Sequence, residues 1–141
     1  MGLGSEESPL EEAQPEELAS EVKLINWSTL QTLEKYGGKE LVAETLQEFE
    51  MEAEELLAEA AVGIKKNDYP QILSKLHTLK GNSGTLGLES ISYYAKLIEG
   101  NLKQQDTTSL HQDFETLTAE FAKFRNTYKQ SINQKDQQHV R

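Results

Sequence analysis

The sequence predicts an all-α protein: an up-down antiparallel four-helix bundle with a short additional N-terminal helix. Four stretches place apolar residues at steps of three and four, the pattern of a helix with one buried face. The connections between them are short, which makes consecutive helices antiparallel neighbours. No stretch shows the apolar–polar alternation that is typical of a β-strand.

The length of 141 residues suits a single domain with flanking tails. Residues 1–22 contain seven glutamates, two prolines and no lysine or arginine. Such a segment buries too little apolar surface to order itself. We therefore predict a disordered acidic tail or linker at 1–22, the four-helix bundle at 23–132 and a frayed C-terminal tail at 133–141.

The formal net charge of −10 argues against nucleic acid and anionic membranes as partners, because both require a basic surface. Much of this charge lies in the predicted tail, so the folded part is only mildly acidic. The chain has no cysteine, which excludes disulfides and thiolate metal sites. No stretch approaches the roughly 20 apolar residues of a membrane span, and no secretory signal pattern is present. We expect a cytoplasmic protein with no nucleic-acid partner and no membrane insertion.

The first half of the chain predicts a short helix and a long one. The short helix is expected at 24–36, with Asn26 or Ser28 as N-cap and Gly37-Gly38 at its end. Its inward side chains are expected to be Trp27, Leu30 and Leu33. The long helix is expected at 39–66, and its apolar stripe consists of Val42, Leu46, Phe49, Ala53, Leu56, Ala60 and Ile64. Another face carries Glu44, Glu48, Glu52, Glu55 and Glu59. We interpret that row as a solvated surface and not as a metal site, since no Glu-x-x-His pair accompanies it.

The second half predicts three more bundle helices, at 69–86, 88–104 and 107–132. Asn67-Asp68 separates the first of these from the long helix, and Gly87 ends it. The next helix carries an apolar stripe of Leu88, Ile91, Ala95, Ile98 and Leu102. The last carries Leu110, Phe114, Leu117, Phe121, Phe124 and Tyr128, which we assign to the core.

The residue that points to function is His77, in the helix predicted at 69–86. The buried face of this helix is formed by Ile72, Leu76, Leu79, Ser83 and Leu86. At 100° per residue, His77 lies about 130° from the centre of that face and points toward water. Gly81 and Gly84 lie on the same side as His77, where they leave room for a bulky group. Lys80, at i+3, can bring its ammonium to whatever the ring carries.

An exposed imidazole with free space and one cation suits a group that carries a phosphoryl anion, since neutral imidazole is a good nucleophile near neutral pH. The plainer alternative is that Gly81 and Gly84 end the helix and that His77 is an incidental surface residue. We treat His111 and His139 as incidental.

The segment 77–87, His-Thr-Leu-Lys-Gly-Asn-Ser-Gly-Thr-Leu-Gly, resembles the signature of histidine phosphotransfer (HPt) domains. The matching residues are His77, Leu79, Lys80, Gly81, Leu86 and Gly87, and Gly84 fits a common form of the signature. Leu76 departs from it, because many members have a small residue there. The helix lengths and apolar spacing from about 24 to 130 are also similar to those of HPt domains.

The resemblance implies a phosphorelay role in which His77 accepts a phosphoryl group from one receiver aspartate and passes it to another. Lys80 would neutralise the phosphoryl charge, and Gly81 and Gly84 would give steric access. Leu73 and Ser74 are candidates for receiver docking, although Leu73 is equally suited to a half-buried place in the core. The implied partners are response-regulator receiver domains and a hybrid sensor histidine kinase. No metal or cofactor is expected in this chain, because the receiver supplies Mg²⁺.

Three alternatives remain open at this point. The chain could be the HPt module of a chemotaxis-type kinase, phosphorylated by an ATP-binding domain. It could be a non-catalytic adaptor that binds receivers, or, least in keeping with its sparse ligands, a metal-dependent enzyme. With no kinase or nucleotide-binding segment, the chain is expected to be a phosphoryl carrier and a monomer, not an independent enzyme.

Overall fold

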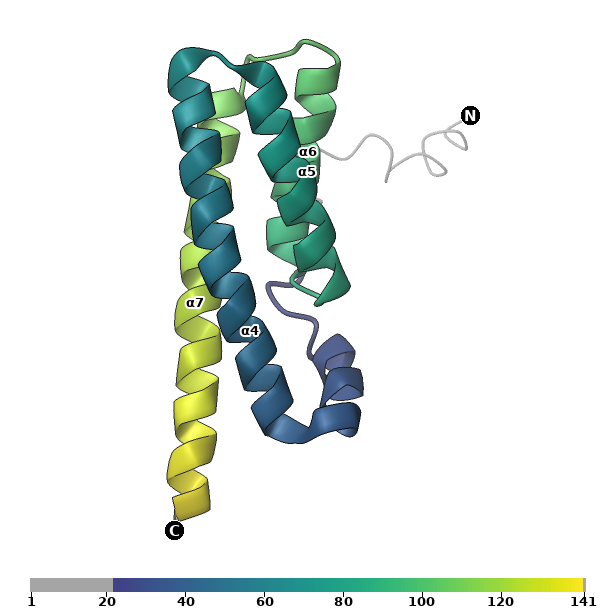
Figure 1. Cartoon of the computed structure of the whole chain (residues 1–141), viewed down its shortest axis with the longest axis vertical. Coiled ribbons are helices and arrows are strands. Elements are labelled where there is room, and N and C mark those ends of the chain that lie inside the picture. Colours follow the sequence, from purple (N-terminus) through teal and green to yellow (C-terminus); the bar gives the residue numbers. More distant parts are fainter. Residues whose placement is uncertain (1–21, 141) are drawn as a thin grey trace, which may run out of the picture.

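The computed structural model describes the backbone of residues 22–140 and the side chains of residues 22–131. This part of the chain consists of four helices and no strand, which confirms the all-α prediction. The helices are α4 (Trp27–Lys66), α5 (Tyr69–Thr85), α6 (Glu89–Lys103) and α7 (Leu110–Val140). The chain runs alternately up and down through them (Figure 1). Each of α4, α5 and α6 packs against the next helix, and α7 packs back on α4. The acidic tail predicted at 1–22 lies, except for its last residue, outside the described residues.

α4 spans Trp27–Lys66, but the helical conformation is interrupted at Gly38, so residues 27–37 and 39–66 are two helical sections joined at a kink. There φ is 75° and ψ is −175°, a conformation that a residue with a Cβ rarely adopts. The predicted Gly37-Gly38 end is therefore a sharp bend between two sections of α4 (Figure 1). We call residues 27–37 the first section of α4. Asn26 is its N-cap, and the Asn26 side chain accepts a hydrogen bond from the Ser28 N–H.

The first section of α4 is only partly packed on the bundle, which corrects one expectation. Leu30 is buried and Leu33 is half-buried, but Trp27 is 41% exposed and does not face the core as predicted. After Gly38 the chain turns away from this section, and the indole of Trp27 lines a cavity between the two sections of α4 and α7. Apolar spacing predicts which side of a helix faces inward, but not how closely the next helix covers it.

The boundaries of α5 are set by local backbone chemistry. Asn67 adopts the left-handed conformation, with φ 53°, and ends α4. The Asp68 side chain accepts a hydrogen bond from the Gln71 N–H, which caps α5, and Pro70 lies in the first turn. At the other end Gly87 has φ 77°, and its carbonyl oxygen accepts a 2.7 Å hydrogen bond from the Asn26 N–H. The turn after α5 therefore also anchors the start of α4.

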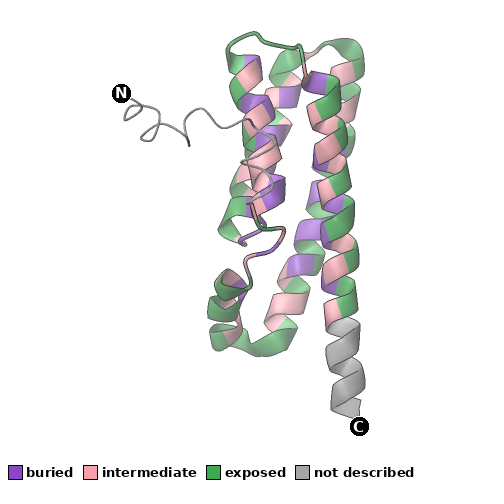
Figure 2. Ribbon diagram, turned by 180° about the vertical axis from the view of Figure 1, so that it is seen from behind, coloured by how far each residue is buried: buried purple, intermediate pink, exposed green. Residues whose placement is uncertain are grey.

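The core lies between the four helices and matches the predicted stripes (Figure 2). In α7, Phe124 packs edge-on against Phe49 of α4, with ring centroids 5.5 Å apart, and stacks on Tyr128 at 4.9 Å. Tyr128 donates a 2.6 Å hydrogen bond to the buried carboxylate of Glu50. Leu76, the departure from the HPt signature, is fully buried. The fully buried apolar side chains are Ala53, Ala60, Ile72, Leu76, Leu79, Leu88, Ile91, Ala95, Leu117 and Phe124.

The outer surface of α4 carries the predicted row of glutamates. Glu44, Glu48, Glu52 and Glu55 are exposed, and Glu59 is half-buried beside Lys75, with Nζ and Oε1 3.0 Å apart. In the part of the chain with described side chains, no group of three or more acidic or histidine side chains is placed to hold a metal ion. No described helix contains a segment long and apolar enough to cross a membrane.

Candidate functional site

His77 lies near the middle of α5 on its outer surface, and 65% of its side chain is exposed. Ile72, Leu76 and Leu79 are completely buried on the opposite side of the helix. The helical spacing therefore predicted the orientation of the imidazole correctly, because α5 is regular from Tyr69 to Thr85.

The carboxylate of Glu99 is the centre of the site, and it comes from the neighbouring helix α6. His77 Nδ1 lies 2.8 Å from Glu99 Oε2, and Lys80 Nζ donates to Oε1 at 2.8 Å. Lys103 Nζ lies 3.3 Å from Oε2, one turn further along α6. Only 5% of the Glu99 side chain is exposed, so a buried carboxylate joins one histidine and two lysines.

The ionisation of Glu99 decides which nitrogen of His77 carries a proton. Burial raises the pKa of this carboxyl, but the hydrogen bonds from Lys80, His77 and Lys103 outweigh burial and lower the pKa to about 2. The group is therefore a carboxylate at neutral pH and can only accept hydrogen bonds. The Nδ1 atom must then be the donor, which leaves the lone pair of a neutral ring on Nε2. The unprotonated nitrogen of the neutral ring is therefore the one that does not contact Glu99.

Gly81 lies inside α5 and Gly84 lies in its last turn, so the helix does not end at Gly81 but continues to Thr85. A Cβ built on Gly81, one turn after His77, meets no atom within 4 Å. A Cβ on Gly84 lies 3.3 Å from Ser92 Oγ of α6, a hydroxyl that donates to the Lys80 carbonyl. Gly81 therefore borders open space, whereas Gly84 also lets α5 and α6 approach each other.

The two docking candidates have different surroundings. Ser74 is exposed, and its carbonyl accepts a hydrogen bond from the Thr78 hydroxyl. Leu73 is half-buried and packs against the core cluster. Of the two, only Ser74 is fully on the surface, while Leu73 offers one edge to it.

Sequence reasoning missed Glu99 and Lys103. A usable signal was present, because Glu99 follows Ala95 by four residues and lies next to Ile98 in the apolar stripe of α6. A carboxylate within a buried stripe needs cationic or hydrogen-bonding partners. The sequence alone did not say that α5 would supply two of them, since that depends on how α5 and α6 are aligned.

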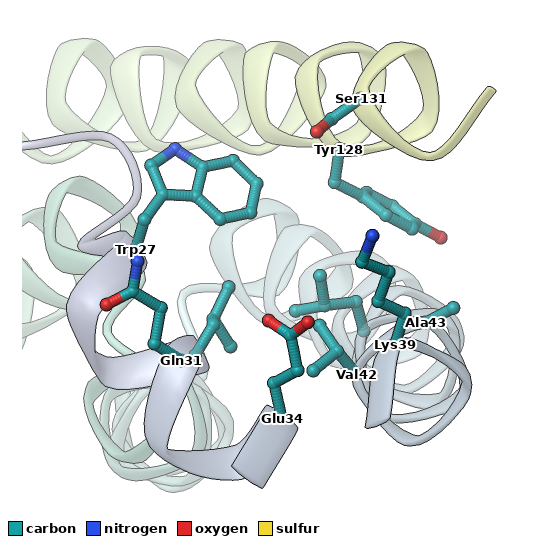
Figure 3. Close-up of a pocket in the computed structure, with 10 residues that line it drawn as sticks. Trp27, Gln31, Glu34, Lys39, Val42, Ala43, Tyr128 and Ser131 are labelled. Atoms are coloured by element: carbon teal, nitrogen blue, oxygen red, sulfur yellow. The ribbon is translucent and has the colours of Figure 1, made fainter. Parts of the chain in front are cut away.

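A pocket lies away from His77, between the first section of α4, the following turns of α4 and α7 (Figure 3). Its volume is about 230 Å³, and no residue of α5 or α6 lines it. Trp27, Leu30 and Tyr128 form part of its wall, and Glu34 and Lys39 lie at its edge. It contributes nothing to the histidine site.

The fold and the site define a helical-bundle domain that presents an exposed histidine oriented by a buried carboxylate. Residues 44–127 match the family model described as Hpt domain, so the chain belongs to the Hpt domain family. Its role is accordingly histidine phosphotransfer in phosphorelays. The chain is also similar to the crystal structure of histidine-containing phosphotransfer protein B (HptB) from Pseudomonas aeruginosa PAO1.

That likeness has a TM-score of 0.73 at 21% sequence identity, and it covers 79% of this chain and 96% of the other. At 21% sequence identity, this likeness is evidence for a shared fold only. No curated protein matches the sequence.

Proposed function

We propose that His77 is the phosphoacceptor through which this chain relays a phosphoryl group between receiver aspartates. The observation that carries this proposal is the pairing of an exposed imidazole with a buried carboxylate at 2.8 Å. The pairing holds Nδ1–H toward Glu99 and directs the Nε2 lone pair to solvent, where a receiver can approach. His111, the other described histidine, is exposed near the start of α7 and is bonded to no such carboxylate.

The chemistry needs little from this chain beyond position and charge. The Nε2 lone pair attacks phosphorus of an aspartyl phosphate, the bond from phosphorus to the aspartate oxygen breaks, and the aspartate leaves as a carboxylate. Phosphoryl transfer depends mainly on in-line positioning and charge neutralisation. Lys80 keeps one N–H on Glu99 and has two further donors for the phosphoryl oxygens. The resemblance to HPt domains implies that the receiver contributes Mg²⁺.

Receiver docking is proposed on the surface around His77. Gly81 provides the open approach, and Ser74 and the exposed edge of Leu73 lie one turn before the histidine. Hpt domains in phosphorelays interact with receiver domains and kinases. The response-regulator partners, the hybrid sensor kinase, the monomeric state and the cytoplasmic location remain predictions for this chain.

The test is phosphoryl transfer in Mg²⁺ from a radiolabelled, phosphorylated receiver to the wild type, to His77→Gln and to His111→Gln. We expect acid-labile, alkali-stable label on the wild type and His111→Gln, and none on His77→Gln. Label on all three would place the acceptor elsewhere. Label on none, with several receivers and with a chemotaxis-type kinase domain as donor, would favour the non-catalytic adaptor.

A further inference from the structure

The hydrogen bond between His77 Nδ1 and Glu99 Oε2 can persist when His77 is phosphorylated. The reacting atom is Nε2, on the far side of the ring from Nδ1, and the Glu99 carboxylate is held in place by burial and by Lys80 and Lys103. The neighbours of Glu99 on α6, Ile98 and Leu102, are buried core residues. The carboxylate is therefore fixed while the exposed side of the ring changes its chemistry.

We propose that Glu99 is a positioning residue that keeps Nδ1 of phosphorylated His77 protonated, an inference that rests on the proposed role of His77. By doing so it determines how readily the phosphohistidine gives up its phosphoryl group. This extends the role of Glu99 from orienting the free ring to controlling the second half of the relay.

The electron count explains why this proton matters. When neutral His77 is phosphorylated on Nε2, the ring loses no proton, and it carries a positive charge that it can keep or release. If Nδ1–H is kept, the P–N electron pair returns to Nε2 during the onward transfer, and the ring leaves as neutral imidazole. If Nδ1–H has been lost to water, the ring must leave as an imidazolate anion, a far more basic and slower leaving group. A carboxylate that accepts the Nδ1–H hydrogen bond favours departure of the ring as neutral imidazole.

The charges that face the ring agree with this role. From α5, Lys80 lies on Oε1 of Glu99, and from α6, Lys103 lies on Oε2 beside Nδ1. No other charged side chain in the described part of the chain contacts Glu99. The two lysines offset the negative charge of Glu99 and so reduce its repulsion with the new dianion. An opposite charge in direct contact shifts such a protonation equilibrium by about one to three pH units.

The experiment uses the full chain phosphorylated with phosphoramidate, in which a P–N bond to ammonia breaks as the bond to Nε2 forms. Loss of the phosphohistidine to water is then followed against pH by ³¹P NMR. The variant is Glu99→Gln, and the matched control is Glu89→Gln, on the same helix but bonded to Asn26 and not to the site. We expect the pH at which phosphohistidine becomes long-lived to fall by at least about one unit in Glu99→Gln alone. At about pH 8 this corresponds to roughly tenfold slower loss.

Overlapping pH profiles for Glu99→Gln and the wild type would overturn the proposal. A second measurement needs no variant: ¹⁵N NMR of the phosphorylated wild type should show Nδ1 protonated at about pH 8, and a deprotonated Nδ1 there would also overturn it. Failure of the proposed function is distinguishable, because His77→Gln would then still be phosphorylated, whereas failure of this inference leaves the label on His77.

Discussion

Replacing Gly87 by alanine should destabilise the protein through one short turn. Gly87 has φ 77°, and a left-handed residue with a Cβ costs about 1–2 kcal/mol. The added Cβ would lie 2.7 Å from Thr29 Cβ and 3.0 Å from the Asn26 carbonyl oxygen. Such overpacking costs about 1–3 kcal/mol. Together these effects predict a loss of about 3 kcal/mol, or a fall in Tm of roughly 10 °C.

The assay is urea and thermal unfolding of Gly87→Ala, followed by circular dichroism of the helices. Trp27 is the only tryptophan of the chain and follows Asn26, so its fluorescence reports separately on the start of α4. The matched control is Gly100→Ala, in the interior of α6, where an added Cβ meets nothing within 4 Å. This control should gain up to about 1 kcal/mol, since alanine is the better helix former.

The reasoning would be refuted if Gly87→Ala were as stable as the wild type. It would also fail if Gly100→Ala lost as much stability as Gly87→Ala, because the effect would then belong to glycine in general and not to this turn. A change in Trp27 fluorescence before the loss of helix would locate the strain at the contact between Gly87 and the Asn26–Thr29 segment.

Two further predictions concern the site. Gly81→Leu should fold normally, because its Cβ position is open. It should slow phosphoryl transfer from a receiver by about a hundredfold, because the leucine side chain misplaces the docked receiver. Phosphorylation by the small molecule phosphoramidate serves as the control and should change little. Glu99 should make the free energy of unfolding depend on pH, because the pKa of its carboxyl falls from 4.5 to about 2 on folding. The carboxylate therefore stabilises the folded state fully above about pH 5, and this contribution is lost as the pH falls toward 2. The advantage of the wild type over Glu99→Gln in urea unfolding should therefore shrink over that range by at most about 3 kcal/mol, because solvent screens the exposed His77 and Lys103. An unchanged difference would contradict the assignment.

The site shows where sequence reasoning was sufficient and where it was not. The outward position of His77 and the proximity of Lys80 follow from spacing within a single helix, so they could be predicted from residues 69–86. The Glu99 contact could not, because it joins residues 22 positions apart on two helices. The roles of Gly81 and Gly84 also looked alike in sequence, and they differ only because Ser92 of α6 packs beside Gly84.

The sequence by itself determined the helical class, the four bundle helices and the face of α5 that carries His77. These features depend on periodicity and on local end signals such as Asp68, Pro70 and Gly87, which act within a few residues. Tertiary structure alone decided that Trp27 stays exposed and that Glu99 meets His77, Lys80 and Lys103. The physical reason is that these outcomes depend on the alignment of one helix against another, which is set by the packing of the whole core.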